Sequence, residues 1–242
     1  MPKIMKEKFK VYHDVFEPIT IKALQKLQAN GYFDYIVKEI SIGKEANVFL
    51  AKKDNKDLAV KIYRIAVMDF KKLKDYFLLD PRFPKVRNSR YDLIFNWTKK
   101  EYRNLVKAYK ECVRVPTPIT SYRNVLIEEF IGNNSIPAPK LKDELPENIE
   151  EFFYDLMENV RKMVLKAGII HGDLSEYNIL NFKEKPFIID FSQSIPYYSP
   201  KAIELLKRDL EKINNFFSKF LKKEKVQEET QKILEEFKEK IK

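Results

Sequence analysis

Hydrophobic and polar positions near the start of the chain change from helical spacing to alternation. Apolar residues between positions 19 and 35 fall near helical spacing, and Asn30-Gly31 is a typical helix stop. The residues that follow alternate in short β-prone runs around Gly43 and around a polar turn. The pattern predicts a helical N-terminal extension over residues 1–36, then strands near residues 37–41, 47–53 and 57–63.

One apolar stripe marks a helix over residues 95–109. Glu101 lies on this stripe with Trp97 and Leu105, so a carboxylate stands among apolar neighbours and needs a partner. Residues 80–91, just before it, hold two prolines and four cations without periodicity, which predicts a surface loop. Two more strands are expected after the helix, near residues 117–121 and 124–130.

Broken patterning at residues 131–140 indicates a boundary between two lobes. Beyond it the sequence predicts a helix over residues 149–166, then a loop and short strands, then helices from about residue 200. The predicted lobes are residues 37–131, rich in strands, and residues 132–242, mostly helical, which makes the fold class α+β. The buried stripe of the last helices is predicted to contain Ile203, Leu206, Leu210, Ile213, Phe216, Phe217 and Phe220.

The composition and charge of this 242-residue chain limit the cellular compartments and partners to be expected. Its single cysteine, Cys112, excludes an internal disulfide framework and is expected to be a small buried hydrophobe in a reducing compartment. No segment approaches the roughly 20 apolar residues that span a bilayer, and the charged N-terminus does not fit a secretory signal. We expect a soluble, cytoplasmic protein without a membrane partner. The net charge of +10 favours phosphate-rich partners, although a heat-adapted surface has a similar composition.

A short polar motif in the second lobe carries the clearest chemistry. His171-Gly172-Asp173 is followed by Asn178, and Asp190 ends an apolar strand. Phosphoryl transfer needs a carboxylate that orients the attacking hydroxyl, together with metal ions that neutralise the phosphate oxygens. Asp173 suits the first role, and Asn178 and Asp190 suit the second. Their oxygen ligands favour Mg²⁺ or Mn²⁺, so the predicted cofactor is ATP with Mg²⁺ or Mn²⁺.

Two features of the first lobe suit a nucleotide. Lys61 stands in the middle of an apolar strand, and an ion pair with Glu101 that aims its ammonium at the phosphates explains both misplaced charges. The residues between the first two strands form a loop whose backbone N–H groups could contact phosphates, although taken alone it also fits an ordinary hairpin turn. This predicted phosphate-binding loop comprises Ser41, Ile42, Gly43, Lys44, Glu45, Ala46, Asn47 and Val48.

These motifs together resemble the RIO family of atypical serine/threonine kinases, Rio-one type. The resemblance rests on SIGKEANVF, LAVKIYR, LIEEFIG, HGDLSEYNIL and IIDFSQS, and it extends from about residue 37 to residue 220. It implies a two-lobed protein-kinase-like fold and a role in maturation of the small ribosomal subunit, with the pre-ribosome and its RNA as partners. Compared with ordinary protein kinases, Gly172 replaces an arginine, Ser175 a lysine and Ser192 a glycine.

The resemblance also implies roles for individual residues. Asp173 is the catalytic aspartate, and Asn178 and Asp190 bind metal. Some members pass through an aspartyl-phosphate, which makes Asp190 a candidate phosphate acceptor. Ser89, in the loop over residues 80–91, is a candidate autophosphorylation site. In the first lobe, residues 41–48 and Lys61 with Glu101 contact the phosphates, and backbone groups of Glu129 and Ile131 hold adenine.

Two alternatives remain open at this stage. A small-molecule phosphotransferase of the aminoglycoside or choline type also carries a His-Gly-Asp-Leu loop, but its acidic substrate pocket is not expected in a chain of net charge +10. A non-catalytic assembly factor would use ATP as a structural switch and its basic surface to contact ribosomal RNA. The intact Asp173 argues against this second alternative.

Overall fold

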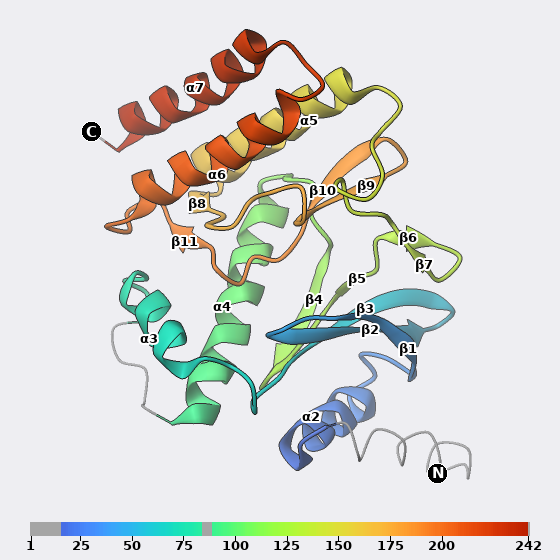
Figure 1. The fold of residues 1–242 in the computed structure, drawn as a ribbon. Helices are drawn as coiled ribbons and strands as arrows, with labels where there is room; N and C mark the ends of the chain where they lie inside the picture. Colours follow the sequence, from blue (N-terminus) through green and yellow to red (C-terminus); the bar gives the residue numbers. More distant parts are fainter. Residues whose placement is uncertain (1–15, 84–88, 242) are drawn as a thin grey trace. The chain divides into compact units, whose positions relative to one another are not determined.

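A computed structural model describes residues 16–83 and 89–241, which divide into two compact units (Figure 1). Among these residues, unit 1 comprises 16–73, 89–99 and 119–130, and unit 2 comprises 74–83, 100–118 and 131–241. None of the helices in the described part of the chain is long and apolar enough to cross a membrane. The predicted lobe boundaries stay predictions.

A five-stranded sheet forms the centre of unit 1. Its strand order is β1-β2-β3-β5-β4, and β1, β2, β3 and β5 pair with their neighbours in antiparallel fashion. The three strands predicted from alternation and the two expected later in the chain are therefore confirmed. Their bounds are β1 (Tyr35–Ile42), β2 (Ala46–Lys53), β3 (Lys56–Tyr63), β4 (Pro118–Tyr122) and β5 (Val125–Glu129).

The predicted N-terminal helix is α2 (Pro18–Ala29), and it belongs to unit 1. Its apolar stripe shares one core with the sheet, in which Leu24 and Val60 are fully buried. Asn124, between β4 and β5, donates hydrogen bonds to Thr20 Oγ1 (2.8 Å) and to the carbonyl of Tyr63 (2.9 Å). One buried amide in the turn between β4 and β5 thus joins the helix to β3.

Two helices follow the third strand along the chain. The sequence did not predict α3 (Phe70–Leu78), whereas α4 (Arg90–Lys110) contains the predicted helix of residues 95–109. The helix starts at Arg90, so the predicted loop over residues 80–91 is wrong at its end, and residues 84–88 lie outside the described residues. Ser89 explains the earlier start, because its hydroxyl accepts a hydrogen bond from the N–H of Asp92 (3.1 Å) as an N-cap.

Helices and three short strand pairs make up unit 2. In Figure 1, α5, α6 and α7 lie side by side, and their apolar stripes share one core with Phe191. The helices are α5 (Ile149–Arg161), which continues as a π-helical turn, η1 (Lys162–Lys166), α6 (Ala202–Phe217) and α7 (Lys223–Lys240). The strand pairs are β6 (Gly132–Asn133) with β7 (Ile136–Pro137), β8 (Ile169–Ile170) with β11 (Ile195–Pro196), and β9 (Ile179–Phe182) with β10 (Lys185–Ile188).

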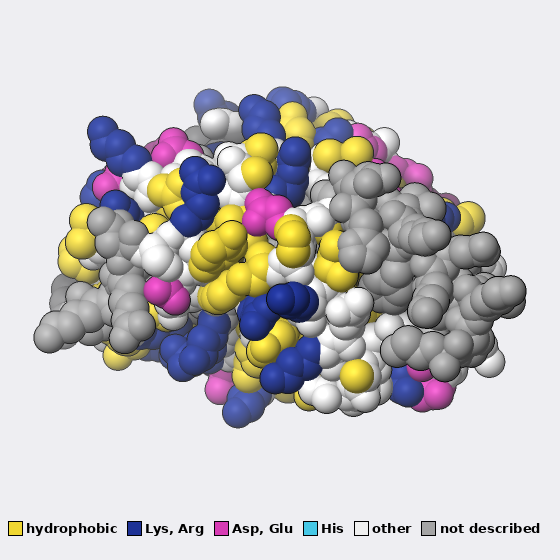
Figure 2. All heavy atoms as spheres, turned by 90° about the horizontal axis from the view of Figure 1, so that it is seen from below, with side chains coloured by type: hydrophobic (Ala, Val, Ile, Leu, Met, Phe, Trp, Pro, Cys, Tyr) yellow, Lys and Arg dark blue, Asp and Glu magenta, His cyan; other side chains and the backbone are white. Residues whose placement is uncertain are grey.

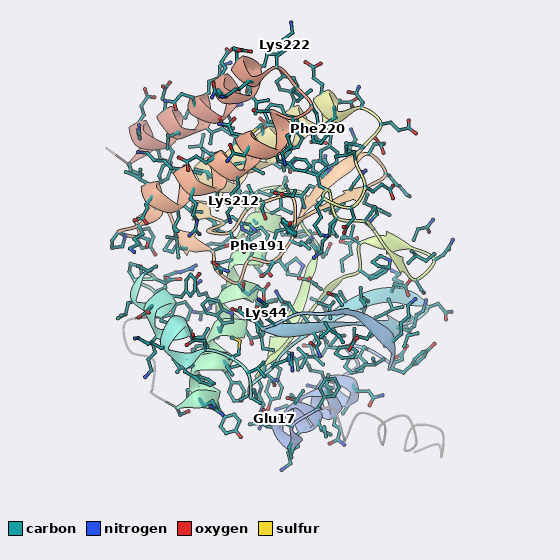
Figure 3. The ribbon with its side chains drawn as sticks, viewed as in Figure 1. Glu17, Lys44, Phe191, Lys212, Phe220 and Lys222 are labelled. Atoms are coloured by element: carbon teal, nitrogen blue, oxygen red, sulfur yellow. The ribbon has the colours of Figure 1, made fainter. Side chains whose placement is uncertain are left out.

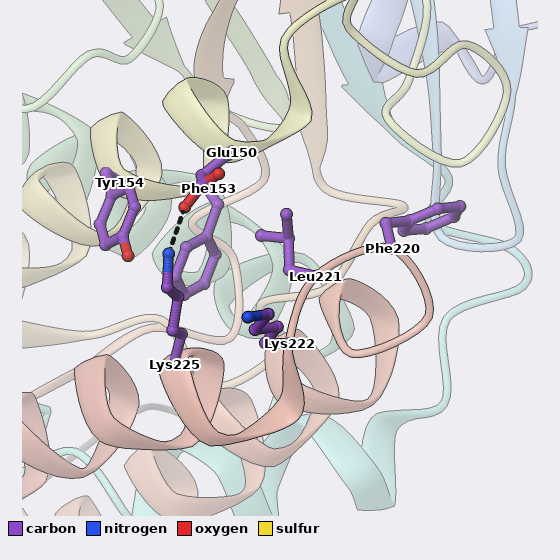
Figure 4. Close-up of a pocket in the computed structure, with 7 residues that line it drawn as sticks. All are labelled: Glu150, Phe153, Tyr154, Phe220, Leu221, Lys222 and Lys225. Atoms are coloured by element: carbon purple, nitrogen blue, oxygen red, sulfur yellow. Dashed lines mark hydrogen bonds and ion pairs between the residues drawn. The ribbon is translucent and has the colours of Figure 1, made fainter.

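Three predictions of burial are wrong. Phe220 and Ile203 are 44% and 37% exposed. Helix α6 ends at Phe217, so the helical spacing no longer applies to Phe220, which instead lines a surface cavity near the start of α7 (Figure 4). Ile203 lies in the first turn of α6 and on its outer side. Cys112 is exposed, in a turn after α4 where its φ is +55°.

Candidate active site

The predicted phosphate-binding loop of unit 1 is a tight hairpin between β1 and β2. Only Gly43, Lys44 and Glu45 lie between the two strands, and the N–H of Gly43 donates to the carbonyl of Ala46 (2.9 Å). A Cβ atom at residue 43 would come within 2.5 Å of that carbonyl oxygen, so the turn requires glycine. The single glycine is therefore explained by the close approach of the two strands.

Lys61 is aligned with this hairpin by the register of the sheet. Ser41 pairs with Val48, Val48 with Lys61, and Lys61 with Leu126, which makes one row across four strands. Lys61 is 8% exposed, and its ammonium lies 5.3 Å from the centre of the Tyr63 ring. Glu101 is 2% exposed but belongs to unit 2, so its pairing with Lys61 stays a prediction.

Arg64 supports the hairpin and was not predicted. Its N–H donates to the carbonyl of Glu45 (2.9 Å), and its Nη1 donates to the carbonyl of Gly43 (3.3 Å). Within the hairpin, Asn47 is 8% exposed, and its side-chain oxygen has no hydrogen-bond donor among the described residues. Ser41 and Lys44 are exposed.

The residues predicted to hold adenine lie where the chain passes from β5 into unit 2. Glu129 is the last residue of β5 and pairs with Leu58 of β3. The carbonyl of Ile131 accepts a hydrogen bond from the N–H of Ala138 (3.0 Å), so this carbonyl is used within unit 2. The adenine contacts of Glu129 and Ile131 stay predictions.

Asp173 and Asn178 are joined directly in unit 2. The side-chain amide nitrogen of Asn178 donates a hydrogen bond to the backbone carbonyl of Asp173 (2.9 Å). The carboxylate of Asp173 is 39% exposed and lies 2.7 Å from the ammonium of Lys212 on α6. Two of the three residues predicted for phosphoryl transfer are therefore neighbours in one loop.

Asp190 is brought to this loop by the strand before it. The N–H of Ile189 donates to the carbonyl of Asn178 (3.0 Å), and Asp190 Oδ1 accepts hydrogen bonds from the Ser192 hydroxyl (2.6 Å) and N–H (3.3 Å). Asp190 has a φ of +65°, which is uncommon outside glycine and is typical of strained functional positions. The Asn178 amide and the Asp190 carboxylate offer oxygen ligands, which fits Mg²⁺ that completes its shell with water and phosphate.

His171 stabilises the loop as a neutral, buried side chain. Burial lowers the pKa of His171, and its ring packs 5.1 Å from the ring of Phe191. The N–H of Asp173 points at Nδ1 (3.3 Å), so Nδ1 acts as the acceptor and Nε2 donates to the carbonyl of Ile189 (3.0 Å). The histidine therefore connects the two halves of the motif.

Helix α6 fixes the backbone of the same loop, which the sequence did not predict. Asp209 is 2% exposed, and its carboxylate accepts hydrogen bonds from the N–H groups of Gly172 (2.7 Å) and Leu174 (3.1 Å). Arg208 donates to the carbonyl of Gly172. The sequence does contain a signal for this role. Asp209 is a charged residue on the apolar stripe of α6, just as Glu101 is on the apolar stripe of α4.

Side chains of α3 and α4 hold the segment after Asp190. Lys100 is fully buried and donates to the carbonyl of Ser192 (2.9 Å), and burial lowers its pKa to about 7. Asn104 donates to the carbonyl of Ser194 (2.9 Å). The hydroxyl of Tyr76 donates to Gln193 Oε1 (2.6 Å). The segment is thus held by partners far away in the sequence.

Comparisons with known proteins agree on one family. A family model described as the RIO domain matches residues 47–231. The RIO-type serine/threonine-protein kinase Rio1 of Methanocaldococcus jannaschii is 41% identical over 211 residues, which are 87% of this chain and 72% of that protein. The protein of the same name from Haloferax volcanii is 39% identical over 212 residues, which are 87% of this chain and 73% of that protein.

Solved structures agree on the fold. The Rio2 kinase from Chaetomium thermophilum, in a complex with ADP, Mg²⁺ and phosphoaspartate, superposes with a TM-score of 0.64 at 23% identity. The match covers 83% of this chain and 60% of that chain. The fold is α+β and protein-kinase-like, as the sequence predicted.

Proposed function

Because the chain belongs to the RIO family of serine/threonine kinases, we propose that it transfers the γ-phosphoryl group of ATP to a hydroxyl. The hydrogen bond between the Asn178 side chain and the backbone carbonyl of Asp173 carries this proposal. It places a residue that can bind a metal ion next to a residue whose carboxylate can take a proton. Asp190 adds a second oxygen ligand, because the N–H of the preceding residue, Ile189, donates a hydrogen bond to the carbonyl of Asn178.

Asp173 suits the role of the group that orients the attacking hydroxyl. Its carboxylate is 39% exposed, so an acceptor can reach it. The hydroxyl oxygen forms a bond to the γ-phosphorus, the bond to the β-phosphate oxygen breaks, ADP leaves with that electron pair, and the hydroxyl proton passes to Asp173. Asn178 and Asp190 would hold Mg²⁺ or Mn²⁺, which supplies charge neutralisation on the phosphate oxygens when bound.

The group that receives the phosphoryl group decides whether the activity is that of a protein kinase, of autophosphorylation or of an ATPase. Ser89 offers a hydroxyl for autophosphorylation, and it is exposed. Water as acceptor gives ATP hydrolysis. The Rio2 kinase of Chaetomium thermophilum is described in a phosphoaspartate complex, and in this chain Asp190, with its positive φ, is our candidate acceptor.

The test is incubation of the purified chain with γ-labelled ATP and Mg²⁺ or Mn²⁺. We expect metal-dependent phosphate release or self-labelling that Asp173→Ala abolishes, while Asp143→Ala, which removes an exposed carboxylate, leaves it unchanged. Acid-stable label that Ser89→Ala removes identifies the serine, and acid-labile label that Asp190→Ala removes identifies the aspartate. ATP binding with turnover no greater than that of Asp173→Ala would contradict the proposal and favour a nucleotide-dependent switch.

We further propose that the chain acts in the cytoplasm, in maturation of the small ribosomal subunit. The net charge of +10 supports a phosphate-rich partner such as ribosomal RNA. Figure 2 shows Lys and Arg side chains spread among hydrophobic and acidic ones on one face. Co-sedimentation with small-subunit precursors, in a salt series, tests this role. Binding that is absent at low salt would contradict it.

A further inference from the structure

A lysine from α6 forms a short contact with the proposed catalytic carboxylate. Lys212 Nζ lies 2.7 Å from Asp173 Oδ1, and both side chains are partly exposed, at 36% and 39%. Figure 3 labels Lys212 on α6 and Phe191 in the segment after Asp190. Lys212 lies 39 residues after Asp173 in the sequence, outside the motifs that predicted the site.

The two oxygens of Asp173 have different contacts. Oδ1 receives the ammonium of Lys212 at 2.7 Å, whereas Oδ2 faces the side-chain amide of Gln193 at 3.5 Å. A donor at 3.5 Å is at the limit of a hydrogen bond, while 2.7 Å is typical of a charge-assisted one. The lysine therefore fixes one oxygen, and among the described residues the other has only a long contact that an acceptor hydroxyl could replace.

The part of α6 that carries Lys212 is bound to the loop that contains Asp173. Asp209 and Arg208, three and four residues before Lys212, bond the backbone of Gly172 and Leu174. Residues three or four apart lie on one face of a helix. The same face of α6 thus contacts the loop backbone and the Asp173 carboxylate. Ser175, two residues after Asp173, contributes no charge of its own.

A contribution to stability does not account for this pair. Ion pairs between partly exposed side chains contribute little to stability, because water and salt screen the charges and both side chains lose rotamer freedom. The loop already has the buried hydrogen bonds of Asp209, which hold its backbone. Lys212 instead fixes the orientation of the Asp173 carboxylate.

We propose that Lys212 is a positioning residue for phosphoryl transfer, which keeps Asp173 Oδ1 in place so that Oδ2 accepts the proton of the attacking hydroxyl. The inference rests on the function proposed above. A group that acts through Asp173 changes the rate of the chemical step more than the affinity for nucleotide.

The test compares Lys212→Met and Lys212→Arg with wild type in Mg²⁺-dependent phosphate release and self-labelling. We expect Lys212→Met to lower kcat about 10- to 100-fold, as misplacement of a reacting group does, with the KM for ATP changed by less than about threefold. Lys212→Arg, which keeps the positive charge, should recover most of kcat. The control is Lys207→Met, an exposed lysine of the same helix, and it should behave as wild type.

Three results would overturn the inference. They are a kcat of Lys212→Met close to that of wild type, a loss confined to the KM for ATP, and a Lys212→Arg no more active than Lys212→Met. If the wild type shows no turnover at all, the proposed function fails, and crystal structures of wild type and Lys212→Met decide the positioning separately. An Asp173 side chain that turns away in Lys212→Met supports the inference, and an unchanged one refutes it.

Discussion

Asp209 Oδ2 accepts a hydrogen bond of 2.7 Å from the backbone N–H of Gly172, which connects the middle of α6 to the loop that carries Asp173. The carboxylate is buried, and its other oxygen accepts from the N–H of Leu174. Buried N–H groups must find acceptors, and a short loop offers few within itself. The helix supplies them, so the stability of the site depends on the charge state of Asp209.

Asp209 should make stability depend on pH in the acidic range. Burial raises the pKa of Asp209 to about 7, against the opposing effect of its two N–H donors. A raised folded-state pKa gives a contribution that is complete below the unfolded value of 3.8 and is lost as pH rises through about 7. Wild type should therefore lose about 2 to 3 kcal/mol of unfolding free energy between pH 5 and pH 7, relative to Asp209→Asn.

Urea denaturation at pH 5, 6, 7 and 8 measures this difference. The exposed Glu211 on the same helix provides the control, since Glu211→Gln should show the pH dependence of wild type. A constant difference between wild type and Asp209→Asn over this range would show that the ionised form of Asp209 is as well accommodated in the fold as in the unfolded chain.

Lys100 should have the opposite effect in the alkaline range. Burial lowers its pKa to about 7, and the nearby carboxylates of Asp80 and Glu101 only partly oppose this. A lowered folded-state pKa gives a contribution that is present above the unfolded value of 10.5 and is lost as pH falls through about 7. Between pH 7 and pH 9, wild type should gain up to about 3 kcal/mol relative to Lys100→Met.

The measurement is again the unfolding free energy in urea, at pH 7, 8 and 9. Lys99→Met removes the exposed neighbour and should follow wild type. Equal slopes for wild type and Lys100→Met would mean that Lys100 stays charged throughout. In that case the hydrogen bond to the carbonyl of Ser192 would be a charged one over the whole range.

The sequence predicted those parts of the fold and site that depend on neighbours along the chain. Alternation gave β1 to β3, and the motif residues Asp173, Asn178 and Asp190 meet because few residues separate them. The partners that support them come from far away: Lys100 is 92 residues from Ser192, and Asp209 is 37 residues from Gly172. Such pairings are set by tertiary packing, and periodicity indicates only that a charge on an apolar stripe needs some partner.

The errors have local physical causes. Helix α3 has apolar residues at Phe70, Leu73 and Phe77, which is helical spacing, but it lies beside a stretch whose two prolines favour a loop. Burial is the expectation for Cys112 because free cysteines are usually buried, whereas this one occupies a turn with positive φ.

Ser89 should stabilise α4 as well as offer a hydroxyl for phosphorylation. Its hydroxyl accepts from the N–H of Asp92 and donates to the Asp92 carboxylate (2.9 Å). Ser89→Ala should therefore cost about 1 kcal/mol of unfolding free energy, while Ser89→Thr, which keeps the cap, should cost little. Urea denaturation of both variants measures this. Equal stability of Ser89→Ala and wild type would mean that the cap contributes nothing in solution.

Gly172 and Gly31 provide a matched pair that separates backbone strain from steric contact. Both have positive φ, +80° and +75°. A Cβ atom at residue 31 would meet nothing within 4 Å, whereas one at residue 172 would come within 2.9 Å of the backbone carbonyl oxygen of Gln193. Gly31→Ala should cost about 1 kcal/mol for the positive φ alone, and Gly172→Ala should cost that amount plus the contact.

The steric contact at residue 172 should also lower the rate of phosphate release. Residue 172 precedes Asp173, and Gln193 contacts the Asp173 carboxylate, so a shift that relieves the contact moves the proposed catalytic group. We expect Gly172→Ala to lower phosphate release about 10- to 100-fold, while Gly31→Ala stays near wild type. The unfolding free energy and the turnover of both variants are measured together. If Gly172→Ala matches Gly31→Ala in both, the loop has room for a side chain, and the glycine is required only for its backbone conformation.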